Sequence, residues 1–257
     1  MSRTSSFGWG ALGILLALTV MQVLVATGAV SGSAMPTALA MLMAFGNLIV
    51  SKTFVSALSD TMISTLLAFG IVAAAGIPMG IVLGASRPAN RLMSGLVELL
   101  RPVPAIALLP VAILALGIGT EMKVSLASYA ALWPMLISTM AGVRDTDQMM
   151  VRTGRSFTWS RATIMRRVQL PSALPFIGSG ARQSISVALV IVVTLELLGA
   201  RSGIGAVIRE YSAAGRVDFV YAGILTTALL GLVLHLALAR LERRLMRWAP
   251  QYRRTTP

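Results

Sequence analysis

Long apolar runs separated by short polar segments extend along most of the chain. A transmembrane helix needs roughly 20 predominantly apolar residues. Runs of this kind predict six such helices, over residues 9–30, 61–86, 102–120, 124–143, 177–200 and 219–239. We therefore expect an all-α integral membrane protein. Residues 1–257 should form a single transmembrane domain, with its core bundle in 61–248.

Two segments near the N-terminus leave alternatives open. The run 9–30 predicts a first transmembrane helix, although a signal peptide cleaved near Gly32-Ser33-Ala34 is the alternative. The apolar part is long for a signal peptide, which favours an uncleaved anchor. Segment 36–59 predicts a helix or loop on the outer surface, and a short seventh span is its alternative.

The basic residues predict an orientation in the membrane. The chain holds 22 Lys and Arg against 9 Asp and Glu, a net charge of +13. With six spans and a cytoplasmic N-terminus, 17 of the 22 fall in cytoplasmic segments and 5 outside. Lys and Arg accumulate on the cytoplasmic side of membrane proteins, so both termini are expected there. A seventh span in 36–59 would place the basic segments outside.

Composition excludes several classes of function. Hydrophobic residues make up 56% of the chain and charged residues only 12%, about half the usual share for a soluble domain. The basic segments are not interleaved with aromatic residues, which argues against nucleic-acid binding. The absence of Cys excludes disulfides and thiol catalysis, and with a single His no metal site is predicted. No nucleophile is paired with a base, so an enzyme is not expected.

Glycines repeat at every fourth position in the second apolar run. Gly76, Gly80 and Gly84 lie on one face of the predicted helix. Small residues at this spacing let another backbone approach closely. We expect them to pack against another helix of the same subunit, and a dimer contact is the alternative.

Four residues within the apolar runs are candidates for a translocation pathway or its gate: Ser64, Pro104, Trp133 and Glu196. Prolines in a helix free backbone carbonyls, which are tolerated at membrane depth where protein or a water-filled cavity satisfies them. Glu196 is the only acidic residue deep in a predicted span, and a carboxylate there usually faces the bundle interior. Kinked packing and a structural carboxylate are the alternatives. No Lys or Arg is expected deep in the spans to hold an anion.

Segment 144–175 is long, basic and predicted to be cytoplasmic. Asp145 or Asp147 is suited to the N-cap of a short helix. A second basic helix is expected over 161–168, ending at Leu170-Pro171. The first helix would carry an apolar side made of Met149, Met150, Thr153 and Phe157. Such a side suits a partner's groove, and packing on the chain's own helix ends or on lipid headgroups is the alternative.

This segment resembles the cytoplasmic loop of permease subunits of bacterial ABC importers. That loop carries Glu-Ala-Ala, three residues, Gly, nine residues, a branched apolar residue, one residue and Leu-Pro. Val168-Gln169-Leu170-Pro171 matches the end. Arg152-Thr153-Gly154 stands at the Glu-Ala-Ala positions and Thr158 at the Gly position.

Further strings are similar to the nitrate, sulfonate and taurine branch of that family. They are GIPMGIVLG at 76–84, the long stretch 96–144, LELLGARSGIGAVI at 195–208 and FVYAGILTTALLGLVL at 219–234. The resemblance covers about 64–248. It implies a location in the bacterial inner membrane, with several membrane-spanning passes.

The resemblance implies the transmembrane subunit of an ATP-driven importer. Two permease copies, by default identical, would form the pathway for a small solute such as a sulfonate, taurine or nitrate. A binding protein would deliver the solute, and two ATPase subunits would bind ATP and Mg. The chain has no phosphate-binding Gly-x-x-x-x-Gly-Lys-Ser/Thr loop, so no cofactor is expected on it. A secondary transporter or channel without an ATPase is the alternative.

The same resemblance implies a coupling helix over about 149–157 that docks in the ATPase. The residues assigned to this coupling loop are Met149, Met150, Arg152, Thr153, Gly154, Phe157, Thr158, Leu170 and Pro171. Two of them depart from the family pattern. Arg152 reverses the charge of the family Glu, and Thr158 is not expected to take easily the left-handed conformation that Gly allows. We expect docking to survive with altered polar contacts.

Overall fold

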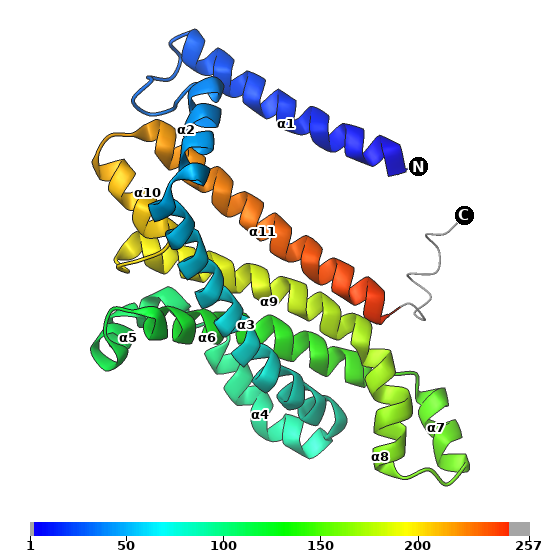
Figure 1. Cartoon of the computed structure of the whole chain (residues 1–257). Helices are drawn as coiled ribbons and strands as arrows, with labels where there is room; N and C mark the ends of the chain where they lie inside the picture. The colour runs from blue at the N-terminus through cyan, green and yellow to red at the C-terminus, as the bar shows by residue number, and fades with distance from the viewer. Residues whose placement is uncertain (1–2, 247–257) are drawn as a thin grey trace. The chain divides into compact units, whose positions relative to one another are not determined.

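The computed structural model describes residues 3–246, and every regular element in that part of the chain is a helix (Figure 1). The α-helices are α1 (Arg3–Ala26), α2 (Ala38–Val50), α3 (Lys52–Ala85), α4 (Arg87–Leu100), α5 (Leu109–Leu116), α6 (Thr120–Arg144), α7 (Gln148–Ser156), α8 (Arg161–Ile164), α9 (Leu170–Leu198), α10 (Ile204–Ala213) and α11 (Val217–Leu245). A 3₁₀ turn, η1 (Ala105–Leu108), precedes α5, and a π-helical turn, η2 (Met165–Gln169), joins α8 to α9. The expected all-α class is confirmed for the described residues.

Four helical stretches are long and apolar enough to cross a membrane. They are Lys52–Ala85, Thr120–Arg144, Arg161–Leu198 and Val217–Arg244, and each contains most of a predicted span. The first predicted span falls on α1, in which the described apolar helix is the shorter stretch Leu15–Ala26. The structure therefore supports a multi-pass protein, while the count of six and the side of the termini stay predictions. Arg247, Arg253, Arg254 and the end of the 61–248 region lie outside the described residues.

The predicted third span is broken rather than continuous. Helix α4 and the η1–α5 stretch together pass the same test for a span but are bent by 80°. Pro102 and Pro104 lie in the break, and Pro110 lies in the first turn of α5. Proline removes a backbone donor and clashes with the preceding turn, and two prolines separated by one residue favour a break here over one continuous helix. The hydroxyl of Tyr129 on α6 donates to the carbonyl of Leu100 at 2.7 Å, which satisfies an acceptor where α4 ends.

The predicted stop at Leu170-Pro171 does not end the helix. The chain passes from α8 through η2 into α9, and the amide of Leu170 donates to the carbonyl of Met165 in the wider turn. Pro171 then lies in the first turn of α9, where a missing amide costs little. A π-helical turn is one of the few ways in which a helix absorbs a local irregularity without ending.

Segment 36–59 forms α2 and the first part of α3. The side chain of Thr37 caps α2 by accepting from the amide of Ala40 at 3.2 Å. The backbone becomes extended at Ser51 before α3 begins. At 13 residues, α2 is too short to cross the hydrocarbon core alone.

The chain divides into two compact units. The first contains residues up to Asp60 together with Ser202–Leu229, and the second contains Thr61–Arg201 and the chain from Leu230. In the first unit α1 packs on α2. The side chain of Tyr211 on α10 stacks on Phe219 of α11 with ring centroids 4.6 Å apart.

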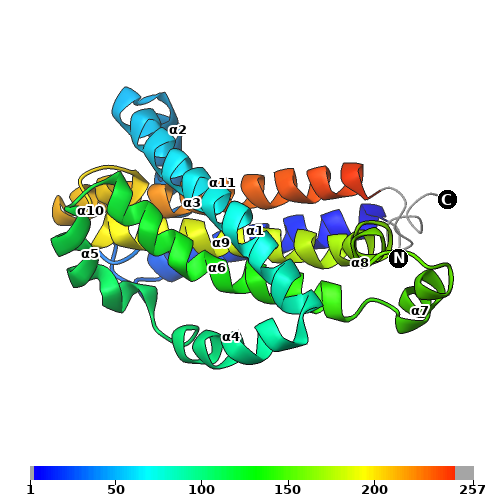
Figure 2. The ribbon, with the colours of Figure 1, turned by 90° about the horizontal axis from the view of Figure 1, so that it is seen from below.

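The core of the second unit is the packing of α6 on α9, which lie side by side in Figures 1 and 2. Glycines allow the close approach. A Cβ on Gly142 would lie 2.7 Å from Phe176 Cβ, and one on Gly180 would lie 2.7 Å from Ser138 Cβ. Small and medium apolar side chains fill the buried cluster where α3 joins this pair: Ala68, Val72, Val124, Ala127, Ala131, Met135, Ala188 and Val192. Small residues at helix contacts are typical of membrane bundles, where close packing drives association.

Candidate functional site

Helix α7 occupies the start of the basic segment, and Asp147 provides its N-cap. The carboxylate of Asp147 accepts from the amide of Met149 at 2.7 Å. A carboxylate there satisfies a free amide and complements the helix dipole. The helix runs from Gln148 to Ser156, close to the expected 149–157.

One face of α7 exposes large apolar side chains. Met149 is 70% exposed, Met150 56% and Phe157 67%. Successive helical residues advance by about 100°, which places Thr153 among these three on the same face. The hydroxyl of Thr153 donates to the carbonyl of Met149 at 2.9 Å, so its methyl group is left on the surface. Exposed apolar groups gathered on a short helix are a candidate contact surface for a protein partner or for lipid.

The C-terminus of α7 contradicts one expectation. Thr158 has φ of +58°, so it adopts the left-handed conformation that was not expected of a β-branched residue. The amide of Thr158 donates to the carbonyl of Arg155, and the amide of Trp159 donates to that of Gly154. This pair of bonds is the Schellman motif, which usually has Gly at the left-handed position. The motif forms without the glycine because local hydrogen bonds and the packing of Trp159 offset the strain.

Trp159 fixes the end of α7 to α8 and η2. A Cβ on Gly154 would lie 3.2 Å from Trp159 Cε3 and 3.3 Å from Ile164 Cγ1. The guanidinium carbon of Arg167 lies 5.5 Å from the centroid of the Trp159 ring, within cation–π range. The centroid of the Phe157 ring lies 6.4 Å from that of Trp159. A small residue at Gly154 is therefore required by contact with an aromatic side chain, a partner that the motif spacing alone did not identify.

The remaining residues of the expected coupling loop lie around this core. Arg152 is exposed on α7 and, among the described residues, forms no ion pair. Leu170 and Pro171 are half-buried in the first turn of α9. Helix α7 and the Leu170-Pro171 end of the motif are thus connected by α8 and η2.

A buried cluster of polar residues lies in the second unit. The ammonium of Lys123 on α6 lies 2.9 Å from Oε1 of Glu196 on α9, and the two side chains are 1% and 0% exposed. The hydroxyl of Thr61 on α3 lies 3.1 Å from Oε1 and 2.9 Å from Oε2 of the same carboxylate. Three helices therefore meet at one carboxylate.

Lys123 lies just before the predicted span 124–143, yet its side chain is buried within the protein. It is close to the start of α6 and was assigned to the outside because Glu121 and Lys123 interrupt the apolar pattern. A buried carboxylate needs a partner that satisfies its charge. That requirement, applied to Glu196, is the signal that could have pointed to Lys123.

The other candidates for the pathway lie in different surroundings. The hydroxyl of Ser64, one turn beyond Thr61, and Nε1 of Trp133 are buried and have no hydrogen-bond partner among the described residues. The Trp133 ring meets Tyr129 edge to face, with centroids 5.7 Å apart. Pro104 is exposed at the start of η1.

Gly76, Gly80 and Gly84 face α6. A Cβ on Gly76 would lie 3.1 Å from Met135 Cγ, and one on Gly80 would lie 2.6 Å from Thr139 Cβ. The corresponding distance from Gly84 to Val143 Cβ is 2.8 Å. The spacing of four residues therefore serves contact between two helices of one subunit.

No group of three or more His, Cys, Asp or Glu residues that could hold a metal ion occurs within 3–246. The exposed face of α7 and the buried carboxylate cluster are two arrangements with functional potential. The exposed face of α7 suits a protein partner, and the carboxylate cluster suits a contact that holds three helices together.

Comparisons with known proteins show which family the chain resembles. Residues 76–247 match the family model described as "Binding-protein-dependent transport system inner membrane component". The chain is 36% identical to the taurine transport system permease protein of Escherichia coli (strain K12) over 173 residues, which cover 67% of this chain and 63% of that protein. It is 30% identical to a putative aliphatic sulfonates transport permease protein of Bacillus subtilis (strain 168) over 250 residues, 96% of this chain and 90% of the relative.

Solved structures with the same fold include a subunit of the MetNI methionine ABC transporter in inward-facing conformations. It has a TM-score of 0.67 at 20% identity and covers 75% of this chain and 95% of its own. A chain of a bacterial ABC transporter that imports the acidic polysaccharide alginate has a TM-score of 0.61 at 15% identity, covering 94% and 98%. At these identities the likeness concerns the fold alone.

Proposed function

The chain belongs to the binding-protein-dependent transport system inner membrane components, in the branch of ABC transporter permeases for nitrate, sulfonates and taurine, and on this premise we propose that α7 transmits ATP hydrolysis from a separate ATPase to the pathway. The observation that carries the proposal is the exposed apolar face of α7. A face of two Met and one Phe would be unfavourable in water unless a partner covered it. Met side chains adapt to irregular grooves.

The rigidity of the loop supports the same role. A helix that transmits force has to be fixed to the transmembrane helices behind it. Trp159 packs between Gly154, Ile164 and Arg167 at the junction of α7 with α8 and η2. These elements continue into α9, one of the two helices at the core of the second unit. A displacement of α7 would therefore reach α9 directly.

The proposed topology has six spans with both termini in the cytoplasm. The third pass is the region 102–120 that contains η1 and α5, with α4 before it on the cytoplasmic side, and α1 serves as the first. The support is the excess of basic residues in the segments that contain α4 and α7. The location follows as a multi-pass protein of the bacterial inner membrane.

The proposed solute is a small sulfonate, taurine, nitrate or a similar compound, delivered by a binding protein outside the membrane. The names of the relatives support this class. Lys123 is ion-paired with Glu196, so the cluster is better suited to holding helices together than to binding an anion. Selectivity would then lie mainly in the binding protein, with this chain providing a pathway of low affinity.

The residues proposed for that pathway and its gate are Ser64, Pro104, Trp133 and Glu196. Ser64 and Trp133 have buried polar atoms without partners in the described chain, as groups that meet a passing solute or water would have. Glu196 joins three helices through Thr61 and Lys123. Its role would be to hold one conformation of the bundle.

The proposed assembly contains two copies of this chain, two P-loop ATPase subunits that bind ATP and Mg, and the binding protein. A symmetric dimer is the default for such assemblies. This chain would bind no cofactor of its own.

The test is a charge placed on the exposed face of α7. In membranes containing the reconstituted complex, the double variant Met150→Asp/Phe157→Asp should lose ATPase docking and solute-dependent ATP hydrolysis. Arg166→Gln, at an exposed arginine of η2 outside α7, is the control and should retain both. Docking and hydrolysis unchanged in the double variant would refute the assignment of α7.

A further inference from the structure

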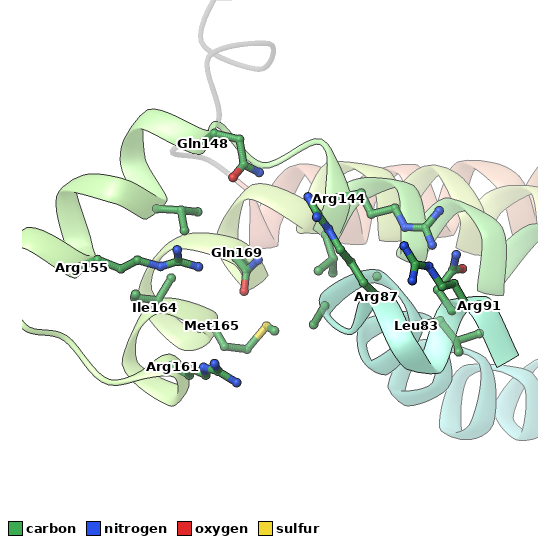
Figure 3. Close-up of a pocket in the computed structure, with 15 residues that line it drawn as sticks. Leu83, Arg87, Arg91, Arg144, Gln148, Arg155, Arg161, Ile164, Met165 and Gln169 are labelled. Carbon is green, nitrogen blue, oxygen red and sulfur yellow. The ribbon is translucent and has the colours of Figure 1, made fainter. Parts of the chain in front are cut away.

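A cavity of about 910 Å³ lies beside α7 in the second unit (Figure 3). Residues at the end of α3, on α4, at the end of α6, on α7 and on α8 and η2 line it. Its apolar floor includes Leu83, Val143, Val151 and Ile164, which are all buried.

Five arginines surround the cavity: Arg87, Arg91, Arg144, Arg155 and Arg161. Figure 3 places the first three on one side and the last two on the other. No Asp or Glu is among the lining residues, and none of the five arginines forms an ion pair within the described chain. Asn90, Gln148 and Gln169 add amide groups that can donate hydrogen bonds.

Five exposed guanidinium groups around one hollow give it a positive potential that favours an anion between them. A concave surface lined by one sign of charge concentrates the opposite charge. The planar guanidinium donates two parallel hydrogen bonds to a phosphate, which makes arginine the preferred residue for such groups. At about 910 Å³ the cavity is also far larger than one small anion of a few atoms requires, since a single water molecule occupies about 30 Å³.

Helix α4 indicates where such an anion comes from. Arg87, Asn90 and Arg91 face the cavity. Other positions of the same helix expose apolar side chains, with Leu92 82% exposed and Leu99 69%. A short helix with a basic side and an exposed apolar side is typical of the membrane–water interface. Basic pockets at this level suit anionic headgroups.

Helix α7 separates this cavity from the proposed ATPase contact. Gln148, Val151 and Arg155 line the cavity. They fall on the side of α7 opposite Met150 and Phe157, since residues advance by about 100° along a helix. A partner that covers the exposed apolar face would therefore not cover the cavity.

We propose that the five-arginine cavity binds the phosphate headgroup of an anionic phospholipid from the cytoplasmic leaflet. The bound lipid joins α4 and α6 to α7 and so fixes the position of the coupling helix. The leaflet assigned here rests on the topology proposed above, whereas the binding of the phosphate group depends only on the cavity.

The experiment exchanges the purified full-length chain into phosphatidylcholine bilayer discs with or without phosphatidylglycerol. Retained lipid is then counted by native mass spectrometry. The triple variant Arg87→Gln/Arg144→Gln/Arg155→Gln should bind phosphatidylglycerol on the order of 100-fold more weakly than the unaltered chain, because each basic residue near a lipid surface contributes substantially. Arg166→Gln, an exposed arginine of η2 that does not line the cavity, is the matched control and should retain the lipid.

Two further arms identify the source of the anion. Inorganic phosphate at millimolar concentration should fail to displace the lipid, and displacement would assign the cavity to a soluble anion instead. Met150→Asp/Phe157→Asp should lose the ATPase but keep the lipid, which separates this proposal from the assignment of α7. Equal lipid retention by the triple variant and the unaltered chain would overturn the proposal. Loss of the ATPase by that variant with its lipid retained would assign the arginines to the protein partner.

Discussion

At the scale of single residues, Glu196 shows that a buried carboxylate requires a residue of opposite charge beside it. Removing one member of a buried ion pair leaves the other charge uncompensated, which costs about 3–5 kcal/mol. Lys123→Met or Glu196→Gln alone should therefore lower the thermal unfolding temperature strongly. The double variant Lys123→Met/Glu196→Gln should be less destabilised than the sum of the two. Tryptophan fluorescence of the protein in detergent provides the measurement.

The matched control for this pair is the exposed ion pair of the first unit. Arg216 lies 3.1 Å from Asp218, and its side chain is 54% exposed. Exposed pairs of this kind contribute little because solvent screens them, so Arg216→Gln should leave the unfolding temperature unchanged. If the effects of the two buried substitutions simply add, Lys123 and Glu196 do not act as a pair.

Thr158 gives a second prediction at the residue scale. The left-handed conformation costs a residue with a Cβ about 1–2 kcal/mol. Thr158→Gly should remove that strain and slow amide hydrogen exchange in α7. Thr153→Gly, inside the same helix, should have the opposite effect, because glycine destabilises a helix interior by up to about 1 kcal/mol. Faster exchange in Thr158→Gly would mean that contacts of the threonine side chain stabilise the turn.

At the scale of elements, the glycines of α3 allow a sharp comparison. A Cβ at Gly80 would lie 2.6 Å from a Thr139 side-chain carbon and 2.9 Å from the Leu136 carbonyl, whereas one at Gly70 would meet nothing within 4 Å. Gly80→Ala should destabilise the protein by about 1–3 kcal/mol through overpacking. Gly70→Ala in the same helix should be neutral or slightly stabilising. Equal unfolding temperatures for the two variants would contradict the observed packing of α3 on α6.

The sequence predicted long elements better than their interruptions. The spans in α3, α6, α9 and α11 could be located because about 20 apolar residues in succession have few alternatives. The prolines at 102 and 104 predicted a kink, but the 80° bend depends on where α4 lies and on the bond from Tyr129. Leu170-Pro171 predicted a helix end, and the π-helical turn that avoids it leaves no pattern in apolar spacing.

Helix α7 was predictable from local signals, because Asp147 and the apolar residues that follow it are close in sequence. The contacts of Trp159 and Lys123 were not, because each depends on a residue from another element. The five-arginine cavity was also missed, since its five arginines come from four separate helices, α4, α6, α7 and α8. Contacts between residues of different helices are therefore the part of the site that a single sequence does not predict.

At the scale of the whole molecule, the topology can be tested on a favourable background. The chain has no Cys, so one introduced thiol reports one position. Ser156→Cys at the end of α7 should react with a membrane-impermeant maleimide only in inside-out vesicles. Ser212→Cys in α10 should react only in right-side-out cells. Both serines are exposed. Labelling of the two from the same side would contradict the proposed alternation of the spans.

The central claim is that the energy for transport comes from another chain. The most direct test is gentle detergent purification of the tagged protein from its native host, with the co-purifying chains identified by mass. The account predicts a P-loop ATPase in roughly stoichiometric amount, retained when ATP is trapped with vanadate. A protein that purifies alone or only with copies of itself, across several detergents, would contradict the account and indicate a transporter that works without an ATPase.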